Sequence, residues 1–519
     1  MIYNESEQGD VRQITNPDAT ARAIRAYTID PASGRTIFNP ANASLRQIDP
    51  AFGRDPELRI KTWQEPLIFL SYGREWSPEH TTLALVGHTS LRSEISDALR
   101  PVTSVNTSGP TTLRTYESSL YSEQDFNLQS LELQHIFKNA DQQFIFGARI
   151  QDGEIDDQSQ VLAAIPTTIA GNAFLVDLLV PDAIDSAGSG SSTHDFTRWS
   201  AYGYYTHEVN KELSLIGGLA LEGIDFPDGL QSSPRTSSRK QEKLLSPKLG
   251  LLWQANDNWV LRAAASRSLS GYSIEDQLRL EPSQLAGLVT SYRSLVPTTV
   301  AGTMAGGTND VLTINMSGEL NRDTWLTLEA FHGRFSGSRS FGLYQETVPL
   351  PGTFPNDPGE VTVGSYNQKI DYEETSLLAR LDHLVNDRLS VGTSARWQRV
   401  EIDEATNAPI VATNPLLNDA VSNLYVGSLY GHYQTPEGWF VSGAAEYWMQ
   451  ENDLRGVPLA DANMPILNLS VGRALQNQRG RISLSVLNLL AEDNGMNTLN
   501  YFIAPPDERV FVLSADFSF

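Results

Sequence analysis

The sequence contains no cysteine, which excludes a disulfide framework and any thiolate metal site. Basic residues are few: 38 lysines and arginines stand against 62 aspartates and glutamates, giving a formal net charge of -24 at pH 7. Such a charge repels phosphate backbones, and the chain has no basic stripe to bind them, so nucleic acid is not expected as a partner. Hydrophobic residues still make up 40% of the chain, which excludes a disordered protein.

Long hydrophobic runs are also missing. A transmembrane helix needs about 18 consecutive apolar residues, and the best run, residues 173–180, is short and contains Asp177. A helical membrane protein is therefore excluded. Residues 1–7 lack the basic and apolar regions of a secretory signal. Either the chain is cytosolic, or its natural start lies upstream of Met1; the strand pattern favours the second.

What the sequence does contain is one repeated unit. It consists of a stretch of alternating polar and apolar residues, a four-residue polar turn, a second alternating stretch and a longer polar loop. The turns are rich in Asn, Asp, Pro and Gly, which favour tight turns. The copies predict β-hairpins at residues 67–76 with 81–92, 126–137 with 142–151, 196–208 with 213–224, 244–254 with 259–269, 311–320 with 325–335, 375–384 with 389–400, 423–434 with 439–450 and 466–475 with 480–490.

A last strand at residues 508–519 follows the hairpins, and a further candidate lies at 21–29. About 18 strands are therefore predicted, an even number of the kind that bacterial barrels prefer. Helix is expected only at residues 274–295, within a long loop. We predict an all-β fold with a single large antiparallel transmembrane β-barrel over residues 21–519, preceded by an N-terminal segment at 1–20.

Short turns alternate with long loops along the chain. The longest loops are predicted at residues 93–125, 152–195, 271–310 and 337–374, all at the end opposite to the short turns. Outer-membrane barrels have this asymmetry, with short periplasmic turns and long extracellular loops. A soluble sandwich has no reason to segregate its connections in this way.

The strands alternate between an apolar row and a polar row. A soluble all-β protein with one buried face has the same period of two, so alternation alone does not separate the two classes. Closure of about 18 strands favours the membrane, because hydrocarbon requires every backbone group to be paired. Aromatic residues beside the turns favour it too, since barrels carry interfacial girdles. These aromatic residues are Trp253, Trp259, Trp325, Tyr433 and Trp439.

The polar row supplies candidates for the lining of a lumen. On the predicted register they carry both signs of charge, and we expect them to bond to one another, to a hydrophilic solute or to a plug. The alternative is that they only solvate a wide barrel. The candidates are Glu132, Arg149, Glu222, Lys248, Arg262, Glu329, Arg380, Asp382, Arg396, Glu446, Arg481 and Asp516.

Three stretches resemble the β-barrel of TonB-dependent outer-membrane receptors. Residues 245–253 with 261–268 are similar to a mid-barrel hairpin of that family, and residues 486–490 to its penultimate strand. Residues 509–519 resemble its closing strand, whose terminal aromatics, here Phe517 and Phe519, imply a signal to the barrel-assembly machinery. The family also carries a plug, a TonB box and about 22 strands, and no plug or box is seen in this sequence. Residues 280–287 resemble instead barrel domains that follow tetratricopeptide (TPR) repeats.

No catalytic or cofactor motif is evident. The eight histidines are scattered without ligand spacing, and Ser189 lies in a Gly/Ser-rich loop that is not a G-x-S-x-G elbow. Residues 152–157 cluster acidic side chains that could hold calcium, but we favour a solvated loop tip because their order does not match an EF-hand. We therefore predict no enzyme, no metal site and no cofactor.

The resemblance implies a bacterial outer-membrane protein that mediates passage of an unidentified substrate across that membrane. The alternative is a passive porin or a polysaccharide-export barrel of a TPR-linked protein, and an adhesin or a barrel enzyme is a third class. Expected partners are outer-membrane lipid, lipopolysaccharide and the barrel-assembly machinery. TonB is expected as a partner only if a plug precedes the barrel.

Overall fold

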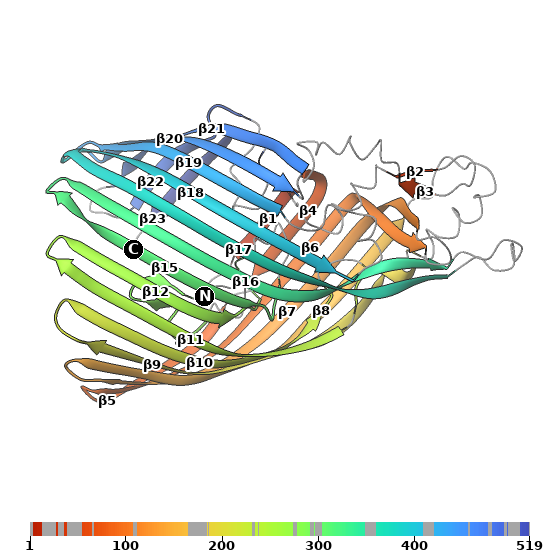
Figure 1. The fold of residues 1–519 in the computed structure, drawn as a ribbon, viewed down its shortest axis with the longest axis horizontal. Coiled ribbons are helices and arrows are strands. Elements are labelled where there is room, and N and C mark those ends of the chain that lie inside the picture. Colours follow the sequence, from red (N-terminus) through yellow and green to blue (C-terminus); the bar gives the residue numbers. More distant parts are fainter. Residues whose placement is uncertain are drawn as a thin grey trace, which may run out of the picture.

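The computed structural model describes most of the chain, and almost all of the described part is strand (Figure 1). The described residues are 4–12, 27–29, 36–38, 54–64, 67–106, 112–163, 184, 186–230, 234–236, 238–272, 278–290, 295, 304–347, 360–407, 420–454, 457–475, 480–492, 496 and 509–517. Within these ranges, no helix has the length and apolar character needed to span a bilayer.

Among the described residues, one large sheet contains 19 strands. From β5 to β12 and from β15 to β23, each strand pairs antiparallel with the next, and β12 pairs with β15. Its strands are β1 (Asn4–Arg12), β4 (Arg54–Gln64), β5 (Ile68–Ser77), β6 (His80–Asn106), β7 (Thr112–Lys138), β8 (Gln142–Ala163), β9 (Gly190–Glu208), β10 (Leu213–Asp228), β11 (Ser238–Asn256), β12 (Trp259–Leu269), β15 (Thr308–Asn321), β16 (Thr324–Thr347), β17 (Glu360–Asn386), β18 (Leu389–Thr406), β19 (Ala420–Gln434), β20 (Trp439–Leu454), β21 (Val457–Ala474), β22 (Gly480–Leu487) and β23 (Val510–Phe517).

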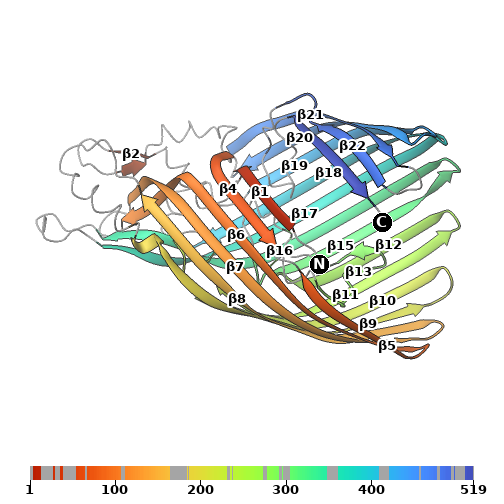
Figure 2. The same cartoon turned by 180° about the vertical axis from the view of Figure 1, so that it is seen from behind.

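The sheet is strongly curled. Strands β4 to β8 form one wall and β15 to β20 form the wall across from it, as the two opposite views show (Figures 1 and 2). All eight predicted hairpins and the last strand are confirmed. In the described part of the chain no register pairs β23 with the first strands. Closure of the ring therefore stays a prediction.

The side chains in the short turns explain why the hairpins form. Asn139 Oδ1 accepts the backbone N–H of Asp141 at 3.1 Å and that of Gln142 at 2.9 Å. Asn210 and Asn386 cap their turns in the same way. These bonds are short-range, which is why turn composition predicts them from sequence.

The strands are longer than predicted at the loop end. A strand crosses a bilayer with about 9–11 residues, whereas β6, β7 and β17 have 27 residues each. The loops predicted at 93–125, 152–195 and 337–374 were therefore wrong over much of their length, because strands run into them. At this end β6 and β16, from opposite walls, meet in a short parallel pairing in which Ser104 lies opposite Tyr344.

The predictions for the first residues also need correction. Tyr27–Ile29 (β2) pairs with Thr36–Phe38 (β3) outside the large sheet, so the strand candidate at 21–29 was wrong as a barrel strand; residues 21–26 lie outside the described ranges. The additional strands are β4, which pairs with β6, and β1, which pairs with β4. β1 lies within residues 1–20, the range predicted as an N-terminal segment; the division of the chain at residue 21 stays a prediction.

The helix predicted at 274–295 is not present in the described part of that range. Residues 278–290 instead contain two short strands, β13 (Gln284–Leu285) and β14 (Leu288–Val289), which pair as a tight hairpin. Ala286 and Gly287 form its turn with φ of 51° and 80°. Two consecutive residues with positive φ match the twist of a two-residue β-turn and are incompatible with a helix.

Candidate functional site in the lumen

The outward face of the sheet is apolar. Leu249 in β11, Leu429 in β19 and Leu513 in β23 are 64%, 65% and 76% exposed, although they lie on strands far apart around the sheet. Each alternates with an inward polar neighbour, such as Lys248 beside Leu249. Contiguous apolar surface of this extent requires a covering, and hydrocarbon provides one for a curled sheet of paired strands.

Four of the five predicted interface aromatics lie on this outward face beside the short turns. Trp253, Tyr433 and Trp439 are exposed there, and Trp259 lies in the outward row of β12. The fifth, Trp325, falls instead in the inward row of β16 that contains the buried Phe335. Its Nε1 donates to Glu319 Oε1 at 3.4 Å.

The twelve predicted lumen residues all fall in inward rows, but in different surroundings. Glu132, Arg149, Glu222 and Lys248, on β7, β8, β10 and β11, are buried. The others are half-buried or exposed and form small polar groups; among them Arg262 donates to Ser317 at 3.1 Å and Asn315 donates to Glu329 at 3.3 Å. The half-buried and exposed candidates are Arg262, Glu329, Arg380, Asp382, Arg396, Glu446, Arg481 and Asp516.

The exposed candidates lie on the wall formed by β17 to β23. Arg380 binds Asp382 through two hydrogen bonds of 2.8 and 3.0 Å, and the hydroxyl of Tyr430 donates to Asp382 at 2.7 Å. Arg481 lies over the ring of Phe440, with its guanidinium carbon 3.9 Å from the centroid. This wall therefore presents guanidinium groups and carboxylates to the interior, which is compatible with the expected polar lumen.

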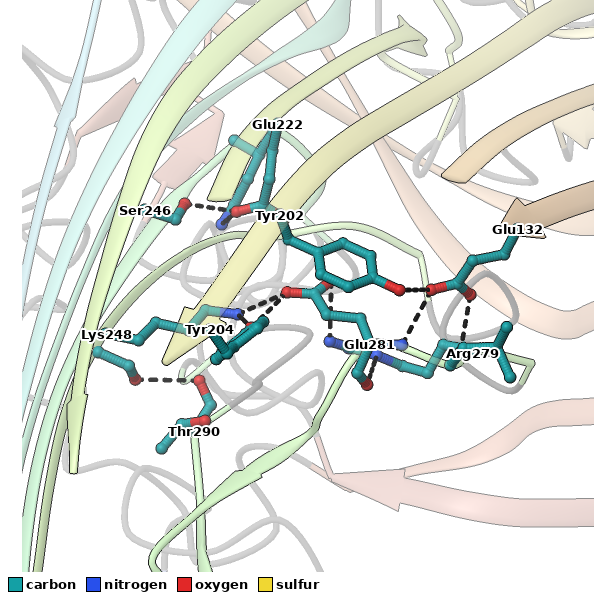
Figure 3. A network of polar contacts seen from close by, with 12 residues as sticks. Glu132, Tyr202, Tyr204, Glu222, Ser246, Lys248, Arg279, Glu281 and Thr290 are labelled. Atoms are coloured by element: carbon teal, nitrogen blue, oxygen red, sulfur yellow. Dashed lines mark hydrogen bonds and ion pairs between the residues drawn. The ribbon is translucent and has the colours of Figure 1, made fainter. Parts of the chain in front are cut away.

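The buried candidates meet a segment that enters the interior. We call residues 278–290, from the connection between β12 and β15, the lumen segment. Glu132 is its main anchor: its Oε2 accepts the backbone N–H of Leu280 at 2.7 Å, and its Oε1 accepts the N–H of Glu281 at 2.9 Å and the hydroxyl of Tyr202 at 2.7 Å (Figure 3). Three donors to one fully buried carboxylate offset the cost of its desolvation.

An ion pair forms the second anchor. Lys248 Nζ lies 2.8 Å from Glu281 Oε1, which also accepts the hydroxyl of Tyr204 at 2.6 Å, and Arg279 lies 3.3 Å from the other carboxylate oxygen (Figure 3). Burial alone would raise the pKa of the Glu281 carboxyl, but Lys248 and Arg279 lower that pKa to about 2.

Apolar contacts complete the docking of the lumen segment. Leu285 and Leu288 pack in a buried cluster with Tyr202 and Tyr204. A Cβ built on Gly250 of β11 would lie 3.1 Å from the Cβ of Leu285, so the absence of a side chain at 250 allows the hairpin to approach the wall closely.

A neighbouring group fixes the start of the connection. Glu222 accepts Arg198 Nη2 at 3.1 Å and Ser246 Oγ at 2.5 Å, and its other contact is the backbone N–H of Leu269 at 3.3 Å. Arg198 also donates to the carbonyl of Leu269 at 3.1 Å. The last residue of β12 is thus held by two buried charges of opposite sign.

The sequence predicted the residues of this site that lie on the barrel strands, but not those that lie on the lumen segment. Glu132, Glu222 and Lys248 were predicted from alternation, whereas Arg279 and Glu281 were not. The wall partners of Glu281, Lys248 and Glu132, are 33 and 149 residues away in the sequence, and no local pattern encodes such contacts. The signal that was present is the Ala286–Gly287 turn between two leucines, which is typical of a tight hairpin.

Residues 152–157 correct a further prediction. They form part of β8, paired with both β7 and β9, and are not a solvated loop tip. Asp157 is buried, contacts Arg235 and accepts Gln124 Nε2 at 2.9 Å. Over the described ranges no group of three or more His, Asp or Glu side chains is placed to hold a metal ion.

The predicted assembly signal lies at the end of β23. The backbone of Phe517 pairs with Gly480, whereas Phe519 lies outside the described residues. Its role in recognition by the assembly machinery stays a prediction.

A curled antiparallel sheet with an apolar outer face and charged inner rows defines an outer-membrane type of β-barrel. A family model described as TonB dependent receptor-like, beta-barrel matches residues 9–303, and the chain belongs to this family. The resemblance read from the sequence is therefore confirmed. No curated protein matches the sequence.

Two solved structures with TM-scores above 0.5 show the same fold at low sequence identity. The chain is similar to BauA, the ferric preacinetobactin receptor from Acinetobacter baumannii, with a TM-score of 0.52 and 11% identity over 89% of this chain and 64% of that one. For the ferric citrate transporter FecA in its unliganded form, the TM-score is 0.52 and the identity 11%, over 89% of this chain and 62% of that one. For the copper transporter OprC, the TM-score is 0.46 and the identity 13%, over 91% of this chain and 76% of that one. The chain thus spans less than two thirds of both BauA and FecA.

Proposed function

We propose that this chain forms the wall of a passage for a hydrophilic substrate across the bacterial outer membrane. The observation that carries the proposal is the separation of side chains on single strands, with Lys248 inward and Leu249 outward in β11. Family membership supports the same location and a receptor or transport role in place of an enzymatic one. The twelve lumen candidates would line the path, and lipid would cover the outward face.

A charge substitution in the purified protein tests the passage. Arg396 reaches the interior from β18 and its side chain is 46% exposed. Replacing it in Arg396→Gln should shift the reversal potential across a planar bilayer toward cation preference, because the lumen loses one positive charge. Arg267→Gln, on the outward face, is the control. The absence of any ion or solute flux, or an identical shift in both variants, would argue against a passage lined by the inward rows.

A passive pore is the second candidate, and one observation favours it. The lumen segment, a part of the barrel chain itself, occupies some of the described interior against the wall of β7 to β11. Energy-coupled uptake with TonB requires a plug, and an export barrel would follow TPR repeats. Sequencing the DNA upstream of Met1 separates these candidates, since each predicts a different preceding segment.

A further inference from the structure

We propose that the lumen segment is a constriction element: residues 278–290, docked on the inner wall, set the width and the charge of the passage, and Gln284 and Val289 are the side chains that a passing solute meets. The inference rests on the proposed function, because a constriction acts only where something passes. It goes beyond that function by assigning the narrowing to one segment and its selectivity to two named positions.

The docking contacts are specific to the backbone of the segment. Glu132 accepts two consecutive backbone N–H groups, and Gln134 Nε2 donates to the carbonyl of Leu280 at 2.8 Å. At the far end Ser266 Oγ donates to the carbonyl of Thr290 at 3.0 Å. These wall groups bind the backbone of the segment near both of its ends, in addition to the contacts that its side chains make.

The charges of segment and wall are complementary. Lys248 from the wall and Arg279 from the segment both contact Glu281, while Glu132 from the wall caps the segment backbone. Breaking such a buried pair leaves an uncompensated charge, which is strongly unfavourable. This arrangement favours one position of the segment over any undocked one.

The hairpin has one face on the wall and one face toward the remaining interior. Leu285 and Leu288 are buried on the wall side, whereas Gln284 and Val289 are exposed. Neighbouring residues in a strand point to opposite faces, so the exposed pair faces away from the wall. A solute between the hairpin and the wall of β17 to β23 would contact these two side chains.

Other described parts of the β12–β15 connection extend the contact to both walls. The ring of Tyr272 packs edge-on against Phe126 and Phe196, with centroids 5.6 and 5.8 Å away. Leu295 and Met304 belong to a buried cluster with residues of β15 to β19, including Ile370. The connection therefore contacts the inner faces of β7 and β9 as well as that of β17, which is the path that a constriction needs.

Two introduced cysteines test the position of the segment. The chain has no native cysteine, so Gly250→Cys with Leu285→Cys can oxidise only with each other. The Cβ separation of 3.1 Å is slightly below the usual disulfide range of about 3.5–4.5 Å. Ser394→Cys with Ser428→Cys, whose hydroxyls are 2.6 Å apart on neighbouring strands, is the control for oxidation within a wall. Oxidation of the first pair in the folded barrel is expected; oxidation of the control alone would overturn the proposal.

Conductance tests the constriction. Glu132→Ala combined with Glu281→Ala should release the segment and raise single-channel conductance severalfold, while Asp310→Asn, which removes an outward ion pair, should leave it unchanged. Gln284→Lys should keep the docked structure but shift preference toward anions, a readout that a purely structural segment would not move. If the cysteine pair oxidises in its own variant but the Glu132→Ala, Glu281→Ala variant conducts like the wild type, the constriction is overturned and the passage stands. If neither the wild type nor the released variant conducts, both the passage and the constriction are overturned.

Discussion

At the scale of residues, the interior places charged groups where few solvent molecules can reach them. Glu132, Glu222 and Glu281 are each buried, and each is matched by donors from two or more elements. A buried carboxylate without partners would be neutralised or would destabilise the fold. The matched donors therefore indicate that these charges hold the lumen segment and the end of β12 in place.

Removal of a single ammonium group tests this matching. Lys248→Met should lower the free energy of unfolding by about 3–5 kcal/mol, because it leaves Glu281 buried without its wall-side partner. Arg380→Met, whose partner on the inner face is Asp382, with side chains 51% and 33% exposed, should cost about 1 kcal/mol or less. Urea unfolding in detergent micelles measures both changes. Equal losses in the two variants would show that Lys248 does not act through a buried pair.

The response to acid follows from the lowered pKa of Glu281. Its carboxyl has a pKa of about 2 when docked, against an ordinary value of 4.5. A depressed pKa contributes stability that is fully present above the ordinary value and is lost as the pH falls toward 2. Docking should therefore be unchanged between pH 7 and pH 5 and should weaken only below about pH 4.5. Oxidation of the Gly250→Cys, Leu285→Cys pair, followed after acid pre-incubation, checks this; release by pH 5.5 would contradict it.

At the scale of elements, each strand separates two environments. In β19 the outward Leu429 is next to the inward Ser428, which lies opposite Glu446 of β20. The same substitution at these adjacent positions should therefore have different effects.

Leu429→Arg should destabilise the barrel by about 2–4 kcal/mol, the cost of a guanidinium on the lipid face near the bilayer midplane. Ser428→Arg should cost much less, because water and Glu446 are available on the inner face. Unfolding from lipid vesicles measures the difference. A smaller loss for Leu429→Arg than for Ser428→Arg would mean that the faces have been assigned the wrong way round.

Elements were predictable where the determining contacts are local. The turns at Asn139, Asn210 and Asn386 form through bonds to residues two or three positions away, and all eight hairpins followed from such signals. Strand ends at the loop side depend on pairing with neighbours, so β6 and β17 run far beyond the alternating stretches. The strands β1 and β4 were missed: β1 lacks a clear alternation, whereas in β4 Leu58 and Ile60 do alternate with Arg59 and Lys61.

The site was predictable only in part, because only some of its contacts are local in the sequence. Alternation placed Glu132 and Lys248 in inward rows, but their partners come from the β12–β15 connection. Glu132 and Glu281 are 149 positions apart, and only the curl of the sheet brings them together. The turn at Ala286 and Gly287 is a local signal for the hairpin at 284–289. No local signal shows that this hairpin folds into the interior and docks on the wall.

At the scale of the whole molecule, the chain is a curled sheet whose two faces differ in chemistry. Its outer face is suited to hydrocarbon, its inner rows are charged, and one connection enters the space between the walls. These three features together support passage across an outer membrane through a narrowed lumen. Each depends on the outward rows meeting lipid.

Site-directed spin labelling tests that dependence most directly. Because the chain has no cysteine, single cysteines at successive positions of β17 to β20 can each carry one nitroxide in the reconstituted barrel. We predict a period of two: labels in the outward rows, as at 429, are relaxed by oxygen dissolved in the bilayer, and labels in the inward rows, as at 428, by a water-soluble nickel chelate. Equal access of both reagents to both rows, or outward labels shielded from oxygen by other protein, would contradict the account.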